Sequence, residues 1–284
     1  MDYKKIIKKP ETRQKILSLF NFIPDKQMVK LQYRIKTGRK LDLKPPVRYT
    51  EKIQWYKLYY REELMWRCAD KLSMRDYIKE IGFGYLLPQI YKTYDDVDTI
   101  NLTKLPNEFV LKSSTGGGGR DIIDYKFYCF GGKCKLIHIA YDRTLGKDVR
   151  IAFFDRDFSP INVTVDCERA ALKENLPQKP KKFEKMVEYA ENLSKLFPHV
   201  RIDLYNIQGE TILGELTFFN MSGYMNFIPD SFDFELGKAF ILPEEKFAGR
   251  DTNRLICVIV IIYKYCYFGD KNNIVYTSQL RGAV

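Results

Sequence analysis

The chain has 284 residues, of which 45% are hydrophobic and 29% are charged, a balance typical of a soluble globular protein rather than a disordered one. It contains 20 tyrosines and 19 phenylalanines but only two histidines, which disfavours histidine-based metal centres and Ser-His-Asp hydrolase sites. We interpret His138 as a strand residue and His199, which follows Pro198, as a turn residue.

The net charge of +11 is confined to one part of the chain. Residues 1–60 contain 16 Lys and Arg and 5 Asp and Glu, which accounts for the whole excess, so the remaining residues balance to zero. Such a basic segment is suited to peripheral contact with an anionic membrane or with an acidic polymer, while a solvated helical face is the plain alternative. A nucleic-acid partner is not expected, because no base-reading or base-stacking module accompanies the charge.

Six cysteines are present without a CxxC pair, and the first residues carry charge but no apolar leader. Spacings of this kind do not fit a zinc ribbon, so we expect reduced, mostly buried thiols. Together these features predict a cytoplasmic protein that contacts the membrane at most peripherally.

The first part of the chain has helical patterning. Apolar residues recur at helical spacing through residues 1–37, with a break at Pro24-Asp25, and predict two basic amphipathic helices that end at Gly38. A further helix is expected to begin with Thr50 as its N-cap, and another to cover about residues 69–81.

Strand patterns dominate the rest of the chain. We expect a strand at Phe109–Lys112, a hairpin around Gly131-Gly132, a helix at Phe183–Phe197, and two strands joined by a tight turn at Gln208-Gly209. The hairpin strands are Tyr125–Phe130 and Lys135–Tyr141, and the strands joined by the tight turn are Val200–Ile207 and Thr211–Phe218. One further strand is expected at Ile151–Asp155. The fold class is therefore α+β, with a helical N-terminal region followed by an antiparallel sheet with flanking helices.

We divide the chain into four regions. Residues 1–85 form the basic helical N-terminal region, and residues 86–123 contain a glycine-rich loop. Residues 124–247 form the sheet and helices that resemble a catalytic core, and residues 248–284 form an atypical C-terminal tail.

The segment KSSTGGGGR, residues 112–120, is a candidate phosphate site. It follows a strand and places Gly116, Gly117, Gly118 and Gly119 in a row behind Lys112 and two serines. Glycines let the backbone approach a phosphate closely, and successive N–H groups can surround an anion. The pattern is neither a Walker A loop nor a Rossmann fingerprint, and a flexible hairpin loop is the alternative.

A second constellation combines Arg201, Asp203 and Glu215. Arg201 and Asp203 lie two residues apart on one predicted strand, so their side chains point to the same face. Glu215 lies on the next strand, and the hairpin can bring it opposite Asp203. Two carboxylates beside an arginine suit a Mg²⁺ and phosphate site, whereas a cross-strand ion pair on a solvent face is the plain reading.

Seven short segments, in this order along the chain, resemble the teichuronopeptide-biosynthesis-like (TupA-like) ATP-grasp family. They are LDLKP from Leu41, YTEKIQW from Tyr49, Asp70-Lys71, FVLK from Phe109, DYKF from Asp124, VRIDLY from Val200 and GELTF from Gly214. The resemblance covers roughly residues 30–245.

This resemblance implies an ATP-grasp fold that binds ATP and Mg²⁺ and phosphorylates a carboxylate, which an amine then attacks. It assigns ATP phosphate contacts to Lys112 and the loop at 116–119, catalytic roles to Arg201 and Lys126, and metal binding to Asp203 and Glu215. The implied activity is a carboxylate–amine ligase of capsule or wall polysaccharide biosynthesis, with a polysaccharide or sugar acid as substrate.

The chain departs from the family's pattern in three places. Thr217 stands where many ATP-grasp proteins have asparagine, and the tail after residue 247 resembles nothing in the family. Between Arg120 and Asp124 the chain lacks a stretch that carries the adenine-contacting hinge in the family, so the nucleotide-clamping subdomain is incomplete. A non-catalytic remnant of a degenerate gene is therefore one alternative. A glycosyltransferase of the same biosynthesis is another, favoured by the basic amphipathic N-terminus, with Asp203 and Glu215 as acids that could bind a metal-diphosphate.

Overall fold

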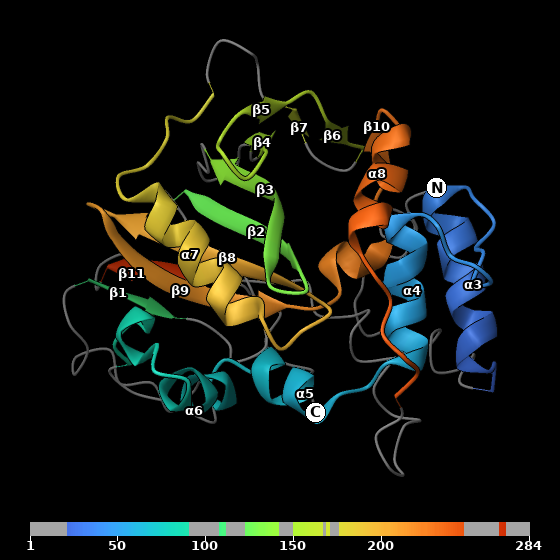
Figure 1. The fold of residues 1–284 in the computed structure, drawn as a ribbon, viewed down its shortest axis with the longest axis horizontal. Coiled ribbons are helices and arrows are strands. Elements are labelled where there is room, and N and C mark those ends of the chain that lie inside the picture. Colours follow the sequence, from blue (N-terminus) through green and yellow to red (C-terminus); the bar gives the residue numbers. More distant parts are fainter. Residues whose placement is uncertain are drawn as a thin grey trace.

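The structure is a computed structural model, and it describes residues 22–90, 123–141, 150–166 and 176–246, together with the strands at 108–111, 169–170 and 267–270. A mostly antiparallel sheet forms the centre of this part of the chain, with helices packed around it (Figure 1). The α+β prediction is therefore confirmed.

The central sheet has the strand order β5-β4-β3-β2-β8-β9, and β7 pairs in parallel with β4. Neighbours along this path are antiparallel, and the hairpins β2–β3 and β8–β9 form where the turn residues predict them. Gln208 and Gly209 both have positive φ, the conformation that a two-residue hairpin turn requires. The strand bounds are β2 Asp124–Phe130, β3 Lys133–Tyr141, β4 Arg150–Phe154, β5 Pro160–Ile161, β7 Arg169–Ala170, β8 His199–Ile207 and β9 Glu210–Thr217.

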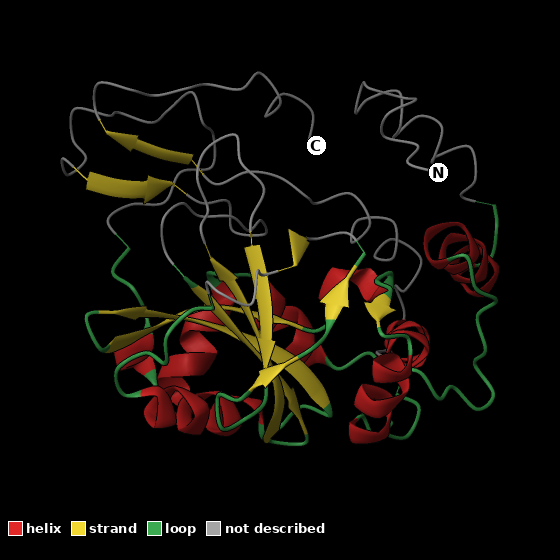
Figure 2. Cartoon of the chain, turned by 90° about the horizontal axis from the view of Figure 1, so that it is seen from above, coloured by secondary structure: helices red, strands yellow, loops and turns green. Residues whose placement is uncertain are grey.

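One face of the sheet is covered by α7, which spans Phe183–Ser194. Its apolar stripe is buried and packs against β2, β3 and β8; for example, the rings of Phe183 and Phe127 stack at 6.4 Å. Because strand side chains alternate between faces, residues such as Lys126 and Asp203 point to the opposite face. Viewed from above, the described helices gather along one face and at one end of the sheet (Figure 2).

The N-terminal region forms α3 Asp25–Thr37, α4 Tyr49–Tyr59, α5 Glu63–Ala69, α6 Ser73–Glu80 and the 3₁₀ turn η1 Gly84–Leu86. Gly38 ends α3 in the left-handed conformation, as its sequence position predicts. The helix expected before α3 lies outside the described residues. None of the helices in the described part of the chain is long and apolar enough to cross a membrane.

After β9 the chain forms the 3₁₀ turn η5 Asn220–Gly223 and helix α8 Ser231–Ala239, which packs on α4. A methyl group on Gly237 would lie 2.2 Å from the Val47 carbonyl oxygen, so glycine permits the close approach of α8 to the start of α4. Two short pairs complete the described strands: β6 Thr164–Val165 with β10 Phe227–Ile228, and β1 Glu108–Leu111 with β11 Tyr267–Asp270.

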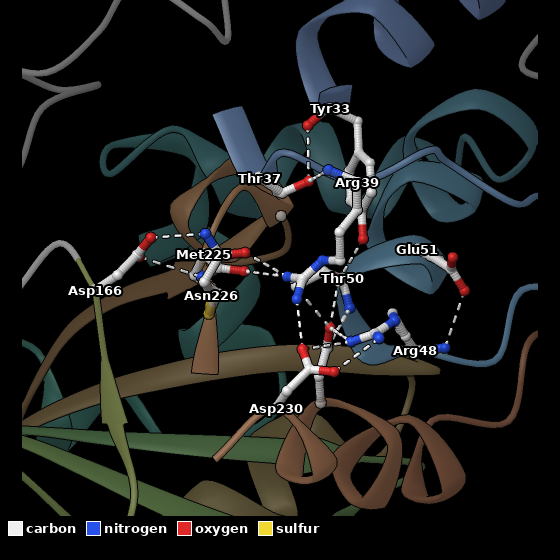
Figure 3. Close-up of polar contacts among 12 residues, drawn as sticks. Tyr33, Thr37, Arg39, Arg48, Thr50, Glu51, Asp166, Met225, Asn226 and Asp230 are labelled. Carbon is white, nitrogen blue, oxygen red and sulfur yellow. Dashed lines mark hydrogen bonds and ion pairs between the residues drawn. The ribbon is translucent and has the colours of Figure 1, made fainter. Parts of the chain in front are cut away.

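Arginine and aspartate side chains join the segment before α4 to the start of α8 (Figure 3). Arg48 binds both carboxylate oxygens of Asp230, at 2.7 and 2.8 Å, and Arg39 reaches Asp230 at 2.5 Å. Behind them, the buried Asp233 accepts hydrogen bonds from the backbone N–H and the hydroxyl of Thr50 at 3.0 and 2.7 Å. We call Arg39, Arg48, Asp230 and Asp233 the junction cluster.

Three local predictions are wrong. Thr50 is not an N-cap, because α4 begins at Tyr49 and the Thr50 hydroxyl donates to Asp233 instead of capping the helix. His199 is not in a turn but is the first residue of β8. The helix expected at about 69–81 is present as α6, but its predicted start is wrong: it begins at Ser73, after a turn in which the Asp70 carboxylate accepts the N–H groups of Leu72 and Ser73.

The prediction of reduced, buried thiols is confirmed for the three cysteines whose side chains the structure describes. Cys68, Cys129 and Cys134 are free and buried. Burial raises the pKa of the Cys68 thiol to about 12, so it stays protonated. The other three cysteines lie outside the side chains that the structure describes.

Candidate functional site

A row of charged side chains crosses three strands on the sheet face opposite α7. Lys126 on β2 pairs with Asp203 on β8, which pairs in turn with Glu215 on β9. Arg201, two residues before Asp203, lies on the same face and next to this row. We call Lys126, Arg201, Asp203 and Glu215 the sheet cluster, and it brings together four residues singled out in the sequence.

A β-bulge at Gly214 makes this arrangement. The β8–β9 pairing shifts by one residue between Leu204, which faces Leu213, and Asp203, which faces Glu215. Without the extra residue, Glu215 would point to the α7 face, because a one-residue slip reverses every side chain. A methyl group on Gly214 would lie 2.9 Å from the Tyr205 ring and 3.1 Å from the Asp203 carbonyl, so the bulge favours glycine.

Arg201 is the centre of the cluster. Its Nε and Nη2 donate to the two carboxylate oxygens of Asp203 at 2.6 and 2.7 Å, a bidentate pair. Nη2 also reaches Glu215 Oε1 at 3.2 Å and Thr217 Oγ1 at 3.1 Å, while Nη1 donates to Asn220 Oδ1. The side chain is buried, so these partners replace the water that the guanidinium loses.

The Asp203 carboxylate is buried and ionised. Lys126 Nζ donates to its Oδ2 at 2.7 Å and lies 3.4 Å from Asp124 Oδ2. Burial raises the pKa of Asp203, but the charges of Arg201 and Lys126 and their hydrogen bonds outweigh burial and hold the pKa at about 2. Arg201 shows the converse: burial lowers its pKa, but the attraction of Asp203 raises it well above its ordinary value.

Glu215 is the accessible member of the cluster. Its side chain is 28% exposed, against 4% for Asp203. Thr217 donates its hydroxyl to Glu215 Oε1 at 3.1 Å, and Lys71 Nζ lies 3.5 Å from Oε2. Lys71 comes from the segment between α5 and α6, so the N-terminal region contributes a cation to the site.

The turn η5 positions Asn220 against Arg201. Asn220 is buried, accepts from Arg201 and donates to the Tyr128 hydroxyl. The next two residues, Met221 and Ser222, have positive φ, which L residues rarely adopt. Gln54 and Lys57 of α4 hold this turn by donating to the Ser222 carbonyl, at 2.9 and 2.5 Å. Burial lowers the pKa of Lys57 to about 7.

The donor set of the cluster fits Mg²⁺. Carboxylate and hydroxyl oxygens are the hard ligands that Mg²⁺ prefers, and the ion needs only one or two protein carboxylates when phosphate and water fill its other positions. Asp203 and Glu215 are two such carboxylates at paired positions; both oxygens of Asp203 are bonded by Arg201 and Lys126, so Glu215 presents the accessible carboxylate. Within the part of the chain that the structure describes, no group of three or more potential His, Cys, Asp or Glu ligands occurs.

Other predicted site residues cannot be placed. Lys112 and Gly116, Gly117, Gly118 and Gly119 lie outside the described residues. Their relation to the sheet cluster therefore stays a prediction.

Sequence reasoning missed two contributors to the site. Asn220 gave no signal before the structure, because its role depends on a turn that folds back onto β8. Lys71 had one available signal, since Asp70-Lys71 is among the segments that resemble the family, but its contact with Glu215 spans more than 140 positions of sequence.

Comparison with known proteins assigns the chain to a family. The family model for TupA-like ATP-grasp proteins matches residues 51–123 and 120–241. The two matched segments overlap at 120–123, where the sequence analysis expects the missing stretch. No curated protein and no solved structure is significantly similar to the chain. Because the family match spans more than half of the chain and includes the whole sheet cluster, this protein belongs to the TupA-like ATP-grasp family.

Proposed function

We propose that the protein is a Mg-ATP-dependent ligase that phosphorylates a sugar-acid carboxylate and joins it to an amine during capsule or wall polysaccharide biosynthesis. Family membership supports the general ATP-grasp ligase type. The observation that carries the proposal is the sheet cluster, in which a buried arginine holds one carboxylate and reaches a second, accessible one.

The charges in and around the sheet cluster suit a triphosphate that is bound together with Mg²⁺. Arg201, Lys126 and Lys71 supply three cations, and Asp203, Asp124 and Glu215 supply three acids within the same network. On this proposal Asp203 and Glu215 hold Mg²⁺, which neutralises phosphate charge when bound. The acids paired with Lys71 and Lys126 would then be shared with the ion, which leaves these ammonium groups able to contact phosphate oxygens.

Arg201 is proposed to stabilise the phosphoryl group during transfer. Its orientation is fixed in advance by Asp203 on one side and Asn220 on the other. A preoriented cation needs little rearrangement as charge develops, and that preorganisation is the main source of electrostatic catalysis.

A non-catalytic remnant is the second candidate. The break in the family match at 120–123 favours it, because the resemblance places part of the nucleotide clamp there. Lost contacts to adenine and ribose would weaken positioning of ATP, and positioning accounts for much of the rate of such transfers. In this case the sheet cluster would survive as a structural network only.

Calorimetry on the purified full chain separates these readings. We expect Mg-ATP to bind with micromolar affinity, and Glu215→Gln to lose at least about tenfold of that affinity because a metal ligand is removed. Glu210→Gln is the matched control, since Glu210 lies on the same strand but pairs with Lys182 at the exposed end. Absence of Mg-ATP binding to folded wild-type protein supports the remnant, and binding or hydrolysis of sugar nucleotides alone supports a glycosyltransferase.

A further inference from the structure

Helix α3 has two apolar stripes, although a helix on a protein surface needs only one. The inner stripe contains Val29 and Tyr33, which are buried and pack with Leu41, Leu43 and Leu58. The outer stripe contains Leu31 and Ile35, whose side chains are 47% and 53% exposed. Residues four positions apart lie on one helix face, so Leu31 and Ile35 form a continuous patch that points away from the core.

Cations flank the outer stripe. Lys30 and Arg34 each directly precede one of its apolar residues, and both are exposed. Lys26, one helical turn earlier, is also exposed, but its ammonium lies over the Tyr59 ring at 6.0 Å and so on the side of the inner stripe. The one acidic residue of α3 is Asp25, which lies 3.7 Å from Arg61 at the start of the helix. We call Lys30, Leu31, Arg34 and Ile35 the outer face of α3.

We propose that the outer face of α3 docks onto an anionic lipid membrane, with the helix lying in the plane of the interface. Leu31 and Ile35 would enter the boundary between head groups and acyl chains, while Lys30 and Arg34 would contact lipid phosphates. The inner stripe stays packed on the protein, so the helix does not have to detach from the core to bind. The surface lies on a different element from the sheet cluster, and the proposal does not depend on the ligase function.

Two arguments favour a membrane over another anionic partner. An acidic polysaccharide or a nucleic acid would pair with the cations but would leave Leu31 and Ile35 in water, whereas a lipid surface accommodates both kinds of side chain. The charge distribution agrees, because the net charge of the whole chain resides in residues 1–60. α3 has 13 residues, too short to span a bilayer, and this favours an in-plane position.

Vesicle co-sedimentation of the full chain tests the proposal. We expect binding to vesicles of phosphatidylcholine with added phosphatidylserine, little binding to phosphatidylcholine alone, and a decrease with added salt. Lys30→Gln with Arg34→Gln should weaken binding about 20- to 30-fold, since each cation near an anionic surface contributes a factor of about five. Leu31→Ser with Ile35→Ser should weaken it about tenfold or more, because the apolar contact is lost.

A matched control keeps the test decisive. Leu196→Ser with Ile241→Ser removes the same two residue types from exposed positions elsewhere, 65% and 81% exposed, and should leave vesicle binding unchanged. Circular dichroism confirms that each variant is folded. Unchanged vesicle binding in the Leu31→Ser, Ile35→Ser variant overturns the proposal. The proposal is also overturned if heparin or DNA binds as strongly as the vesicles, and if only the Lys30→Gln, Arg34→Gln variant loses this binding. That result would assign the outer face of α3 to an acidic polymer.

Discussion

The sheet cluster and the junction cluster use the same residue types in different ways. Each has an arginine that binds a carboxylate through two nitrogens: Arg201 with Asp203 in the sheet, and Arg48 with Asp230 at the junction. In the sheet cluster the bidentate pair is buried and the second acid, Glu215, is accessible. At the junction the order is reversed, because the bidentate acid Asp230 is exposed and the second acid, Asp233, is buried.

The difference separates the candidate site from an architectural joint. The buried acid of the junction binds a backbone N–H and a hydroxyl of α4, so it fixes two chain segments 183 positions apart. Among the described residues, the accessible acid of the sheet cluster contacts the side chains of Arg201, Thr217 and Lys71, which can change partners when a ligand arrives. Charge and bidentate geometry alone therefore do not distinguish the two clusters; the accessibility of the second acid is what makes the sheet cluster the candidate for ligand binding.

The largest effect should come from Asp233→Ala at the junction. Its removal leaves Arg48 with one partner fewer and the Thr50 N–H without its acceptor, and loss of one partner from a buried charged pair costs about 3–5 kcal/mol. Urea unfolding measures this loss. Asp230→Ala, in which the acid is exposed, should cost no more than about 1 kcal/mol. Equal losses in the two variants would contradict the distinction between the buried and the exposed acid.

Glu215→Gln should show the opposite pattern in the sheet cluster. The amide keeps the shape of the side chain, and Arg201 keeps Asp203, Asn220 and Thr217, so the free energy of unfolding should change by no more than about 1 kcal/mol. ATP-dependent turnover should fall about 100-fold or more, because a metal-binding carboxylate is lost. Comparable turnover in variant and parent would show that Glu215 does not take part in the reaction. The sheet cluster would then be a structural network, like the junction cluster.

Much of the sheet cluster follows from alternation along strands. The two-residue spacing of Arg201 and Asp203 places both on one face, and the positive-φ turn at Gln208-Gly209 fixes the hairpin. Counting back from that turn, a regular hairpin pairs Asp203 with Gly214 and sends Glu215 to the α7 face. The prediction that Glu215 faces Asp203 is confirmed only because of the bulge, which a period-two pattern does not encode.

Contacts across long stretches of sequence were beyond prediction. Thr50 has the residue type and position of an N-cap, but Asp233 of α8 competes for its hydroxyl. His199 follows a proline and suggested a turn, yet aromatic rings of α4 and the segment after α8 enclose it. In both cases a tertiary partner overrides a local preference, and a single sequence gives no sign of that partner.

His199, at the start of β8, lies in the buried core and allows a test by pH. It is fully buried; its Nδ1–H donates to the Cys129 carbonyl at 2.9 Å, so Nε2 accepts from the Tyr49 hydroxyl at 2.9 Å. Burial lowers the pKa of His199 from 6.5 to about 3. Between these two values the unfolded chain binds a proton that the folded chain does not, so stability falls as pH decreases, by about 1.4 kcal/mol per pH unit.

Urea unfolding between about pH 6.5 and pH 5 should therefore show a loss of about 2 kcal/mol, before most carboxylates titrate. His199→Gln, which retains an acceptor for Tyr49, should have a lower stability at neutral pH but a shallower dependence in this window. An equal slope in parent and variant would mean that His199 binds a proton as readily in the folded chain as in the unfolded chain, and that its surroundings admit water.

The smallest effect should come from Lys71→Met. This variant tests whether the N-terminal region contacts the nucleotide or only packs beside the sheet cluster. Lys71 lies 3.5 Å from Glu215 and is itself partly exposed, so its removal should leave stability nearly unchanged. If it contacts phosphate once Glu215 binds metal, the KM for Mg-ATP should rise about tenfold, typical for loss of one charge-assisted contact. Lys79→Met is the control, because Lys79 is an exposed lysine of α6 whose ion-pair partner, Asp76, lies in the same helix. This variant should change neither the stability nor the KM for Mg-ATP. An equal rise of the KM in both variants would mean that the KM depends on the total positive charge of the N-terminal region. Lys71 would then be a counter-ion that holds Glu215 in place and not a phosphate contact.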